Sequence, residues 1–351
     1  MSTEPTLGRP EPAAGPAAGA DGTAAAPDVT VVVLNYDSLD YTLRCLESIF
    51  AQSGRSPCRF HVVVVDNGSR SFDRPALERA FPQVEILQSE RNRGFGGGCN
   101  LGAAGRASRF LFFLNNDTVF LNDVIGHLAA ELDAHPRAGL CGAQQYDEAR
   151  QPVRSTRPAP RLFSRGGSGR PDPRAESADR DHPVEVEGLS GADLFIRTDL
   201  FHEAGGFDER IFLYHEEDDL AARVQGRGRT LLLVPQARLL HYHARSSPAR
   251  LSVQMEDALS LIYYFRKHGT RLEAALVRPV LLGRCLGRWI KHQARALAGR
   301  DPRGLAPVYR RLLPWALSGF PERTVAAGRQ RRTDAAPATP AAPAATRGDR
   351  P

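Results

Sequence analysis

The amino-acid sequence predicts an α/β fold, in which a doubly wound, mixed but mostly parallel sheet is flanked by helices. Residues 29–36 (VTVVVLNY) and 60–69 (FHVVVVDNGS) contain continuous valine runs, as expected of strands buried on both faces of a sheet. Residues 41–52 between them have the apolar spacing of a helix. This strand, helix and strand order is the unit from which right-handed parallel sheets are built.

The same alternation continues along the chain. Residues 84–88 (VEILQ) predict a third strand, and a helix is expected near residues 98–107. Residues 109–117 (RFLFFLNND) predict a fourth, strongly apolar strand, and Asn122 is expected to cap the helix that follows it. Residues 257–269 (DALSLIYYFRKHG) predict a long helix that closes the folded domain.

Both ends of the chain are rich in Ala, Pro and Gly, so residues 1–27 and 332–351 are expected to be disordered tails. The first tail lacks the basic cluster and apolar run of a signal peptide, and no stretch approaches 18 uninterrupted apolar residues. The five cysteines are odd in number and widely spaced, which indicates reduced thiols. We therefore expect a cytoplasmic protein without a membrane span.

Positive charge is concentrated near the C-terminus. Residues 266–330 hold 14 Lys or Arg and 3 Asp or Glu, a net charge of +11, within a chain whose net charge is +6. Apolar and basic side chains alternate there in a pattern typical of a helix lying on an anionic membrane surface, and a solvated helix packed on its own domain is the alternative. Nucleic-acid binding is not expected, because aromatic residues are few and no reader motif is present.

Polar residues follow each of the predicted strands at the point where the strand ends. In sheets of this class, ligands gather beyond the carboxyl ends of the strands, so these residues mark one rim of the sheet as a candidate site. The polar residues of this rim are Asn35, Asp66, Asn67, Asn115, Asn116 and Asp117.

The glycines at positions 94 and 96–98 follow the third strand and not the first, and no Lys-Ser/Thr pair accompanies them. Dinucleotide-binding and Walker-type sites are therefore not expected. We expect the glycines to let backbone amides at the start of the next helix approach a diphosphate closely. Asp117 ends an apolar strand, and its oxygens suit a hard divalent cation that also holds phosphate groups.

Residues 216–219 are four consecutive carboxylates that open a predicted helix. Acids in a first turn complement the helix dipole, but their positions around the helix also differ. At about 100° per residue, Glu217 shares the apolar side of Leu220 and Val224, Glu216 lies at its margin and Asp218 points away. Glu217 is therefore expected either to pair with a cation such as Arg223 or to line a cavity.

Seven ordered segments resemble one family, the bacterial family 2 glycosyltransferases of GT-A fold, and in particular their rhamnosyltransferase-like members. The resemblance extends from about residue 29 to residue 268. It rests on VVVLNYDSLDYTLRCLESI, VVVVDNGS, NRGFGGGCNLG, FLFFLNNDT, GADLFIR, GGFDERIFLYHEEDDLAARV and VPQARLLHYHARSS.

The resemblance implies donor-binding roles along the rim, with Asp66 reading a pyrimidine base and Asn35 beside the nucleoside. It also implies that Asp117 binds Mg²⁺ or Mn²⁺ as the last acid of the family's Asp-x-Asp motif, whose first position is Asn115 here. His241 would complete the metal site, with His243 as its competitor. The remaining donor-site candidates are Asn67, Asn92, Gly97, Gly98, Asn100 and Asn116.

In the acidic segment the family usually has Glu-Asp-x-Asp, with its second residue as general base. That position is Glu217 here, with Glu216 as the alternative, and Gly191 and Ala192 would floor the acceptor pocket. The implied reaction is inverting transfer from dTDP-rhamnose or a UDP-sugar to a saccharide or polyprenyl-linked acceptor in cell-envelope polysaccharide synthesis. Two alternative hypotheses are a sugar-1-phosphate nucleotidyltransferase and an inactive sugar-nucleotide-binding protein. The first would need a phosphate-binding loop after the first strand, and this sequence lacks one.

These expectations divide the chain into a glycosyltransferase domain and a C-terminal appendage, placed peripherally on the inner face of the cytoplasmic membrane. The expected divisions are a nucleotide-binding half at 28–144, a flexible insertion at 145–184, an acceptor and catalytic half at 185–270, and a basic helical membrane-associating region at 271–331.

Overall fold

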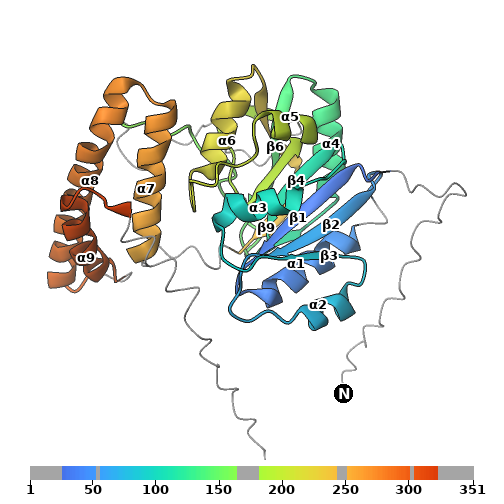
Figure 1. Ribbon diagram of the computed structural model, residues 1–351, viewed down its shortest axis with the longest axis horizontal. Helices are drawn as coiled ribbons and strands as arrows, with labels where there is room; N and C mark the ends of the chain where they lie inside the picture. Colours follow the sequence, from blue (N-terminus) through green and yellow to red (C-terminus); the bar gives the residue numbers. More distant parts are fainter. Residues whose placement is uncertain (1–25, 53–55, 164–181, 243–250, 301–303, 323–351) are drawn as a thin grey trace, which may run out of the picture.

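The computed structural model describes residues 26–52, 56–163, 182–242, 251–300 and 304–322. Within these residues a nine-stranded mixed sheet is covered by helices on both faces, and three further helices lie at one end of the molecule (Figure 1). The tail predicted at 332–351, most of the tail predicted at 1–27, His243 and residues 164–181 of the predicted insertion lie outside the described residues.

The first half of the sheet is parallel, as predicted. Strands β1, β2, β3 and β4 stand in the order β3-β2-β1-β4, and each neighbouring pair is parallel. The carboxyl ends of these strands therefore meet at one rim. The strands are β1 (Val29–Asn35), β2 (Phe60–Asp66), β3 (Glu85–Gln88) and β4 (Phe110–Asn115).

The second half of the sheet is mixed. Strand β8 runs antiparallel to both β4 and β6, β6 runs parallel to β9, and β5 and β7 each pair antiparallel with β9. The long strand β9 thereby brings its C-terminal end to the loop that follows β4. The strands are β5 (Thr118–Phe120), β6 (Ala138–Tyr146), β7 (Val184–Val186), β8 (Asp193–Arg197) and β9 (Thr230–His241).

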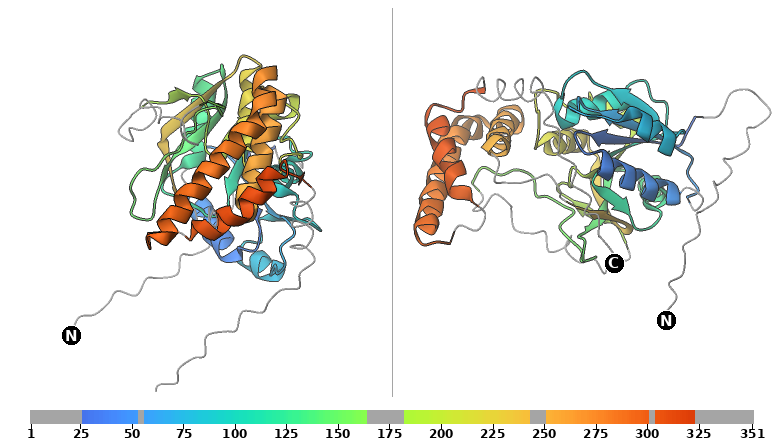
Figure 2. Two further views of the ribbon diagram at one scale, coloured as in Figure 1. Left: turned by 90° about the vertical axis from the view of Figure 1, so that its left-hand side faces the viewer. Right: turned by 90° about the horizontal axis from the view of Figure 1, so that it is seen from below.

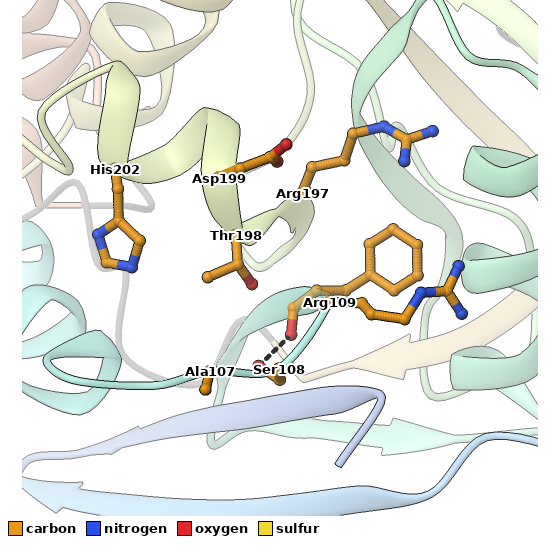
Figure 3. A pocket seen from close by; sticks show the side chains of 8 residues that line it. Ala107, Ser108, Arg109, Arg197, Thr198, Asp199 and His202 are labelled. Carbon is orange, nitrogen blue, oxygen red and sulfur yellow. Dashed lines mark hydrogen bonds between the residues drawn. The ribbon is translucent and has the colours of Figure 1, made fainter. Parts of the chain in front are cut away.

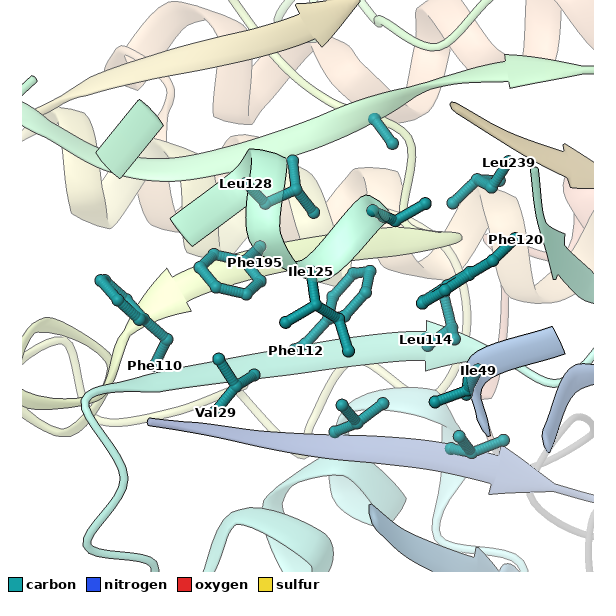
Figure 4. Packing of buried hydrophobic residues seen from close by; sticks show 14 of the residues in the cluster. Val29, Ile49, Phe110, Phe112, Leu114, Phe120, Ile125, Leu128, Phe195 and Leu239 are labelled. Atoms are coloured by element: carbon teal, nitrogen blue, oxygen red, sulfur yellow. The ribbon is translucent and has the colours of Figure 1, made fainter. Parts of the chain in front are cut away.

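Apolar side chains of β4 alternate between the two faces of the sheet. Phe112 packs in one cluster with Leu46 and Ile125, and Phe113 packs in the other with Leu220. Figure 4 shows the first cluster, with Phe112 and Ile125 in it. Every residue from Phe110 to Leu114 is at most 1% exposed, which explains why the strand is a continuous apolar run. Helices α1 (Leu39–Ala51), α2 (Arg74–Ala80) and α4 (Val124–Ala134) cover the first face, and α3 (Gly94–Ala103), α5 (Thr198–Glu203) and α6 (Glu216–Gln225) cover the second.

The C-terminal helices have a hydrophobic cluster of their own. Helices α7 (Leu251–His268), α8 (Arg271–Leu297) and α9 (Leu305–Leu317) pack around it, with Phe265, Val277 and Trp315 among its buried members. Figure 2 shows that α8 and α9 lie beyond α7, on the side away from the sheet. Among the described helices, none combines the length and apolar character needed to cross a membrane.

Two local predictions were wrong. Helix α3 begins at Gly94 and not near residue 98, so the glycines form its first turns, where close packing against the sheet and residues 207–212 requires them. Asp123, and not Asn122, caps α4 by accepting the Gly126 amide at 2.9 Å. The Asn122 side chain instead hydrogen-bonds to the backbone of β9. It accepts from the Arg238 amide at 3.0 Å and donates to the Gln236 carbonyl.

Candidate functional site

The ends of β1 and β2 bring two predicted donor-site residues together. The register pairs Asn35 with Asp66, and Asn35 Nδ2 donates to Asp66 Oδ1 at 2.9 Å. Ser69 donates to the same oxygen at 2.5 Å, and its hydroxyl accepts the Asp37 amide. Both Asn35 and Asp66 are buried, at 1% and 0% exposure, so the carboxylate is held in one orientation at the rim.

Asn67 and Asn92 hold the start of α3 against the end of β2. Asn67 Nδ2 donates to the Gly94 carbonyl at 2.9 Å, and Asn92 Oδ1 accepts the Gly94 amide at 2.9 Å. Gly94 has a φ of +77°, and a Cβ placed there would lie 2.1 Å from the Phe212 carbonyl oxygen. The glycine helix therefore touches the segment that leads into the four acids.

The remaining candidates around α3 face different neighbours. Gly98 lies over the sheet, where an added Cβ would meet the Leu34 side chain at 2.3 Å, whereas Gly97 faces Arg93. Asn100 uses its amide on the backbone of Phe207, donating to its carbonyl and accepting from its N–H, each at 2.9 Å. In this structure Asn100 therefore holds a neighbouring loop.

The loop after β4 meets the end of β9. His241 Nε2 lies 3.3 Å from Asp117 Oδ1, and Tyr242 donates its amide to the Asp117 carbonyl at 2.9 Å. Asn116 turns the other way, donating to the Ser38 and Thr42 hydroxyls at 2.8 Å each. The structure thus brings together the two predicted metal ligands, Asp117 and His241. Asn116 instead contacts α1 and the residue before it.

A single inward acid in α6 was predicted, and this prediction was wrong. All four carboxylates are buried, Asp219 at 0% exposure and the other three at 5% each. The outer side of α6 packs against α7. The apolar periodicity of α6 does not reveal this second partner. Asp218 pairs with His215 at 2.7 Å, and Asp219 pairs with Arg223, Lys267 and His268.

Glu217 lies between the acceptor-side backbone and a cation from another segment. Its Oε1 pairs with Arg157, and its Cδ would be 3.5 Å from a Cβ added at Gly191. Its Oε2 is buried and has no hydrogen-bond partner among the described residues. The carbonyl of Ala192 accepts the Asn115 amide at 2.8 Å, which ties this corner to the loop that carries Asp117.

Burial and neighbouring charges both shift the pKa values of the groups at the start of α6. Burial raises the pKa of Glu217, and the positive charge of Arg157 opposes that rise. Burial and the charge of Glu217 raise the pKa of Glu216 well above its usual range. Burial disfavours a charged His215, but its contacts with Asp218 and Asp257 outweigh burial and raise its pKa to about 10. At neutral pH an imidazolium therefore lies beside the acids.

Three polar residues of this region were missed by sequence reasoning. Arg157 pairs with Glu217, while Gln145 and Asp193 form buried contacts that lead to His241. No sequence pattern indicated a role for Arg157, because it lies in a proline-rich stretch that resembles a surface loop. Asp193 could have been noticed, since a carboxylate followed by the apolar run Leu194–Ile196 is expensive unless it is satisfied.

A separate hollow of about 430 Å³ lies at the opposite end of β4 (Figure 3). Ser108, Arg109, Arg197, Thr198 and His202 are among its lining residues, and Ser108 donates to the Phe110 carbonyl at 2.9 Å. Its two arginines are already engaged, Arg109 with Asp133 and Arg197 with backbone carbonyls. This hollow is therefore distinct from the rim that carries Asp66, Asp117 and Glu217.

Comparisons with known proteins agree with this geometry. Residues 30–177 match the family described as Glycosyl transferase family 2. The N-acetylglucosaminyl-diphospho-decaprenol L-rhamnosyltransferase of Mycobacterium tuberculosis is 30% identical over 239 residues, covering 62% of this chain and 76% of that protein. The succinoglycan biosynthesis protein ExoO of Rhizobium meliloti is 37% identical over 110 residues, covering 31% of this chain and 30% of that protein.

A solved structure of GalNAc-T7 with UDP, GalNAc and Mn²⁺ is similar in fold. The TM-score is 0.52 at 16% sequence identity, over 69% of this chain and 48% of that chain. The present chain thus spans about half of that structure. A likeness at this level of identity shows a shared fold.

Proposed function

We propose that this chain, which belongs to glycosyltransferase family 2, transfers a sugar from a nucleoside-diphosphate donor to a saccharide hydroxyl. The proposed transfer inverts the configuration of the anomeric carbon. The chain is a glycosyltransferase with a GT-A fold, so the proposal concerns its donor, acceptor and residue roles. The observation that carries the base assignment is Glu217, a buried carboxylate with one oxygen on Arg157 and the other without a hydrogen-bond partner among the described residues.

Glu217 is proposed as the general base. Its unpartnered Oε2 would accept the proton of the acceptor hydroxyl while that oxygen attacks the anomeric carbon from the side opposite the diphosphate. Burial keeps the carboxylate basic enough to take a proton, and Arg157 keeps it ionised before the acceptor arrives. Gly191 leaves space beside the carboxylate, since a side chain there would contact Glu217.

Asp117 and His241 are proposed to hold a divalent metal together with the donor diphosphate. One carboxylate oxygen and one imidazole nitrogen face each other at 3.3 Å, and the described residues contain no group of three or more His, Cys, Asp or Glu that could hold a metal. This donor set fits Mg²⁺ or Mn²⁺, which commonly combine few protein ligands with substrate phosphates. When bound, the metal would supply charge stabilisation for the departing diphosphate.

Asp66, Asn35 and Asn67 are proposed to bind the nucleoside end of the donor. Asp66 is ordered by three side-chain donors, of which Gln88 is the most distant at 3.4 Å from Oδ2. A carboxylate fixed in this way can accept from the imide N–H of uracil or thymine. The glycines at the start of α3 support close approach of the diphosphate to the backbone.

The acceptor is proposed to be a lipid-linked saccharide in cell-envelope glycan synthesis, presented at a membrane surface. The name of the mycobacterial relative includes a diphospho-decaprenol acceptor, and helix α8 supplies a surface suited to anionic lipid. Its exposed side chains Leu272, Leu286, Ile290 and Leu297 are spaced by 14, 4 and 7 residues and therefore share one helix face, called the α8 stripe here.

The charge around the α8 stripe favours lipid over another apolar partner. Helix α8 carries six Lys or Arg and one Asp or Glu. By helical position Arg271 and Arg278 flank the stripe on one side, and Arg284 and Lys291 flank it on the other. Cations beside an exposed apolar strip are typical of interfacial helices, each adding about 1 kcal/mol near an anionic surface.

Flotation with liposomes of anionic phospholipid tests the membrane proposal. Leu286→Glu combined with Ile290→Glu is expected to abolish flotation of the full chain, because two charges would enter the lipid interface. The control is Leu317→Glu, which charges an exposed leucine of α9 outside the stripe. Wild-type protein that fails to float, or a double variant that still floats, would contradict the proposed surface.

The reaction is tested by release of nucleoside diphosphate from a panel of dTDP- and UDP-sugars, with and without Mn²⁺. Glu217→Gln is expected to lower turnover by about 10²–10⁴ while nucleotide binding survives. Glu216→Gln is the matched comparison, because the ion pair with Arg157 belongs to Glu217. Pyrophosphate formation from a sugar phosphate and a nucleoside triphosphate would instead support the nucleotidyltransferase reading, and binding without turnover would support the inactive one.

A further inference from the structure

A chain of buried side chains leads from Asp193 to the proposed metal ligands. Gln145 Nε2 donates to Asp193 Oδ1 at 2.5 Å, and Gln145 Oε1 lies 3.1 Å from His241 Nδ1. His241 Nε2 in turn lies 3.3 Å from Asp117 Oδ1. Gln145 is 0% exposed, Asp193 is 1% exposed and His241 is 7% exposed, so bulk water does not compete for these contacts.

The donors and acceptors along this chain are mutually determined. Asp193 Oδ2 accepts the backbone amide of Ala143 at 2.5 Å. Burial raises the pKa of Asp193 to about 8, and above that pH the ionised carboxylate can only accept. Gln145 must therefore turn its NH₂ group toward Asp193 and its oxygen toward His241. The Gln145 oxygen then calls for a proton on His241 Nδ1. With Nδ1 protonated, Nε2 can offer its lone pair to a cation held beside Asp117.

A bulge between β6 and β9 makes this arrangement possible. The register shifts between Ala143 and Gln144, where Ala143 pairs with Val234 but Gln144 pairs with Arg238. The amide of Ala143 at this interruption donates to the Asp193 carboxylate. Bulges commonly redirect side chains next to active sites, and here the direction of a backbone N–H sets the first member of the chain.

We propose that Gln145, oriented by Asp193, is a positioning residue that holds His241 in the tautomer whose Nε2 can bind a metal beside Asp117. Neither Gln145 nor Asp193 touches the metal or the substrate. The inference rests on the proposed function for the identity of the metal, but the tautomer of His241 is a property of the folded chain. Its test therefore includes a measurement that needs neither metal nor turnover.

Asp193→Asn is the sharpest perturbation, because it keeps the shape of the side chain. The Ala143 N–H cannot turn, so the new carboxamide would keep its oxygen there and present its NH₂ group to Gln145. Gln145 would then reverse its amide, and His241 would accept at Nδ1 and carry its proton on Nε2. The substitution should thus invert the tautomer without changing the packing. Gln145→Leu removes the contact between Asp193 and His241 altogether, and it is a second variant in which His241 loses its partner at Nδ1.

Long-range ¹H–¹⁵N correlation spectra of the histidine side chains report the tautomer directly, with His241→Ala assigning the signal. At a pH of about 9, above the pKa of about 8 to which burial raises Asp193, wild-type protein should show Nδ1–H. Asp193→Asn should show Nε2–H. The control Gln144→Leu removes the adjacent buried amide, which contacts Ser155 and Val153 and not His241, and should leave the wild-type tautomer.

Calorimetric titration of Mn²⁺ into protein saturated with UDP or dTDP measures the consequence. Asp193→Asn and Gln145→Leu should each weaken Mn²⁺ binding by about 10–100-fold, the usual effect of losing a partner of a metal-bound histidine, while Gln144→Leu changes little. An Nε2–H tautomer in the wild type, or variants that alter neither the tautomer nor the affinity, would overturn the inference. The predicted tautomers combined with no Mn²⁺ binding in any protein would instead contradict the proposed metal site.

Discussion

The ion pair between Arg157 and Glu217 predicts how turnover depends on pH. Arg157→Gln removes the positive charge but keeps a polar side chain. At a separation of about 4 Å and an effective dielectric of about 20, a unit charge contributes about 4 kcal/mol. The Arg157 side chain is 38% exposed, so solvent screening reduces this value to roughly 1–2 kcal/mol in favour of the ionised form of Glu217.

The direction of the shift in the pH profile follows from the proposed role of the Glu217 carboxylate. A general base must be ionised, so kcat/KM rises with pH up to the pKa of Glu217 and is level above it. Loss of Arg157 raises that pKa further, so the midpoint of the rise should move to higher pH. At lower pH the variant should therefore be about tenfold less active than wild type, with most activity recovered on the alkaline plateau.

Nucleoside diphosphate release measured across a series of buffers gives the profile. Arg161→Gln is the matched control, because Arg161 lies in the same segment, pairs with Glu187 and is 65% exposed. Its profile should coincide with that of wild type. A midpoint that stays in place or falls in Arg157→Gln would refute the reasoning, because the ion pair would then not determine the ionisation of the base.

The remaining predictions concern metal binding and stability. Burial raises the pKa of Asp193 to about 8, so Mn²⁺ affinity should increase as the pH rises toward that value, and Asp193→Asn should remove the trend in calorimetry. Gly94→Ala should cost roughly 1–3 kcal/mol of unfolding free energy in urea titrations, because Gly94 has a φ of +77° and an added Cβ would lie 2.1 Å from the Phe212 carbonyl oxygen. Stabilisation by His215 should be complete below a pH of about 6.5 and lost as the pH rises through about 10, so His215→Gln should lower Tm most in mildly acidic buffer.

Much of the sheet was predictable because its strands are unambiguous in composition. Strands buried on both faces must be apolar at every position, and β1, β2 and β4 met that requirement over most of their length. Their polar ends could also be assigned to one rim, since parallel strands end on the same side. The pairing of Asn35 with Asp66 follows directly from that register.

Helix boundaries near the site were less predictable. Glycine has a poor intrinsic helix propensity, so the segment beginning at Gly94 resembled a loop. It forms the first turns of α3 because Leu34 and residues 207–212 approach it more closely than any side chain would allow. Periodicity likewise located Glu217 on the inner side of α6, but the partners that bury Asp218 and Asp219 lie before the helix and in α7.

The sequence by itself determined the parallel half of the sheet, the rim at its carboxyl ends and the acids available for chemistry, because these depend on local composition and strand order. Only the tertiary structure decided which groups act on those acids and on His241. Arg157 reaches Glu217 across 60 positions, and Gln145 reaches His241 across 96. Contacts between such distant positions depend on how β6, β8 and β9 pack together, and no local pattern encodes that packing.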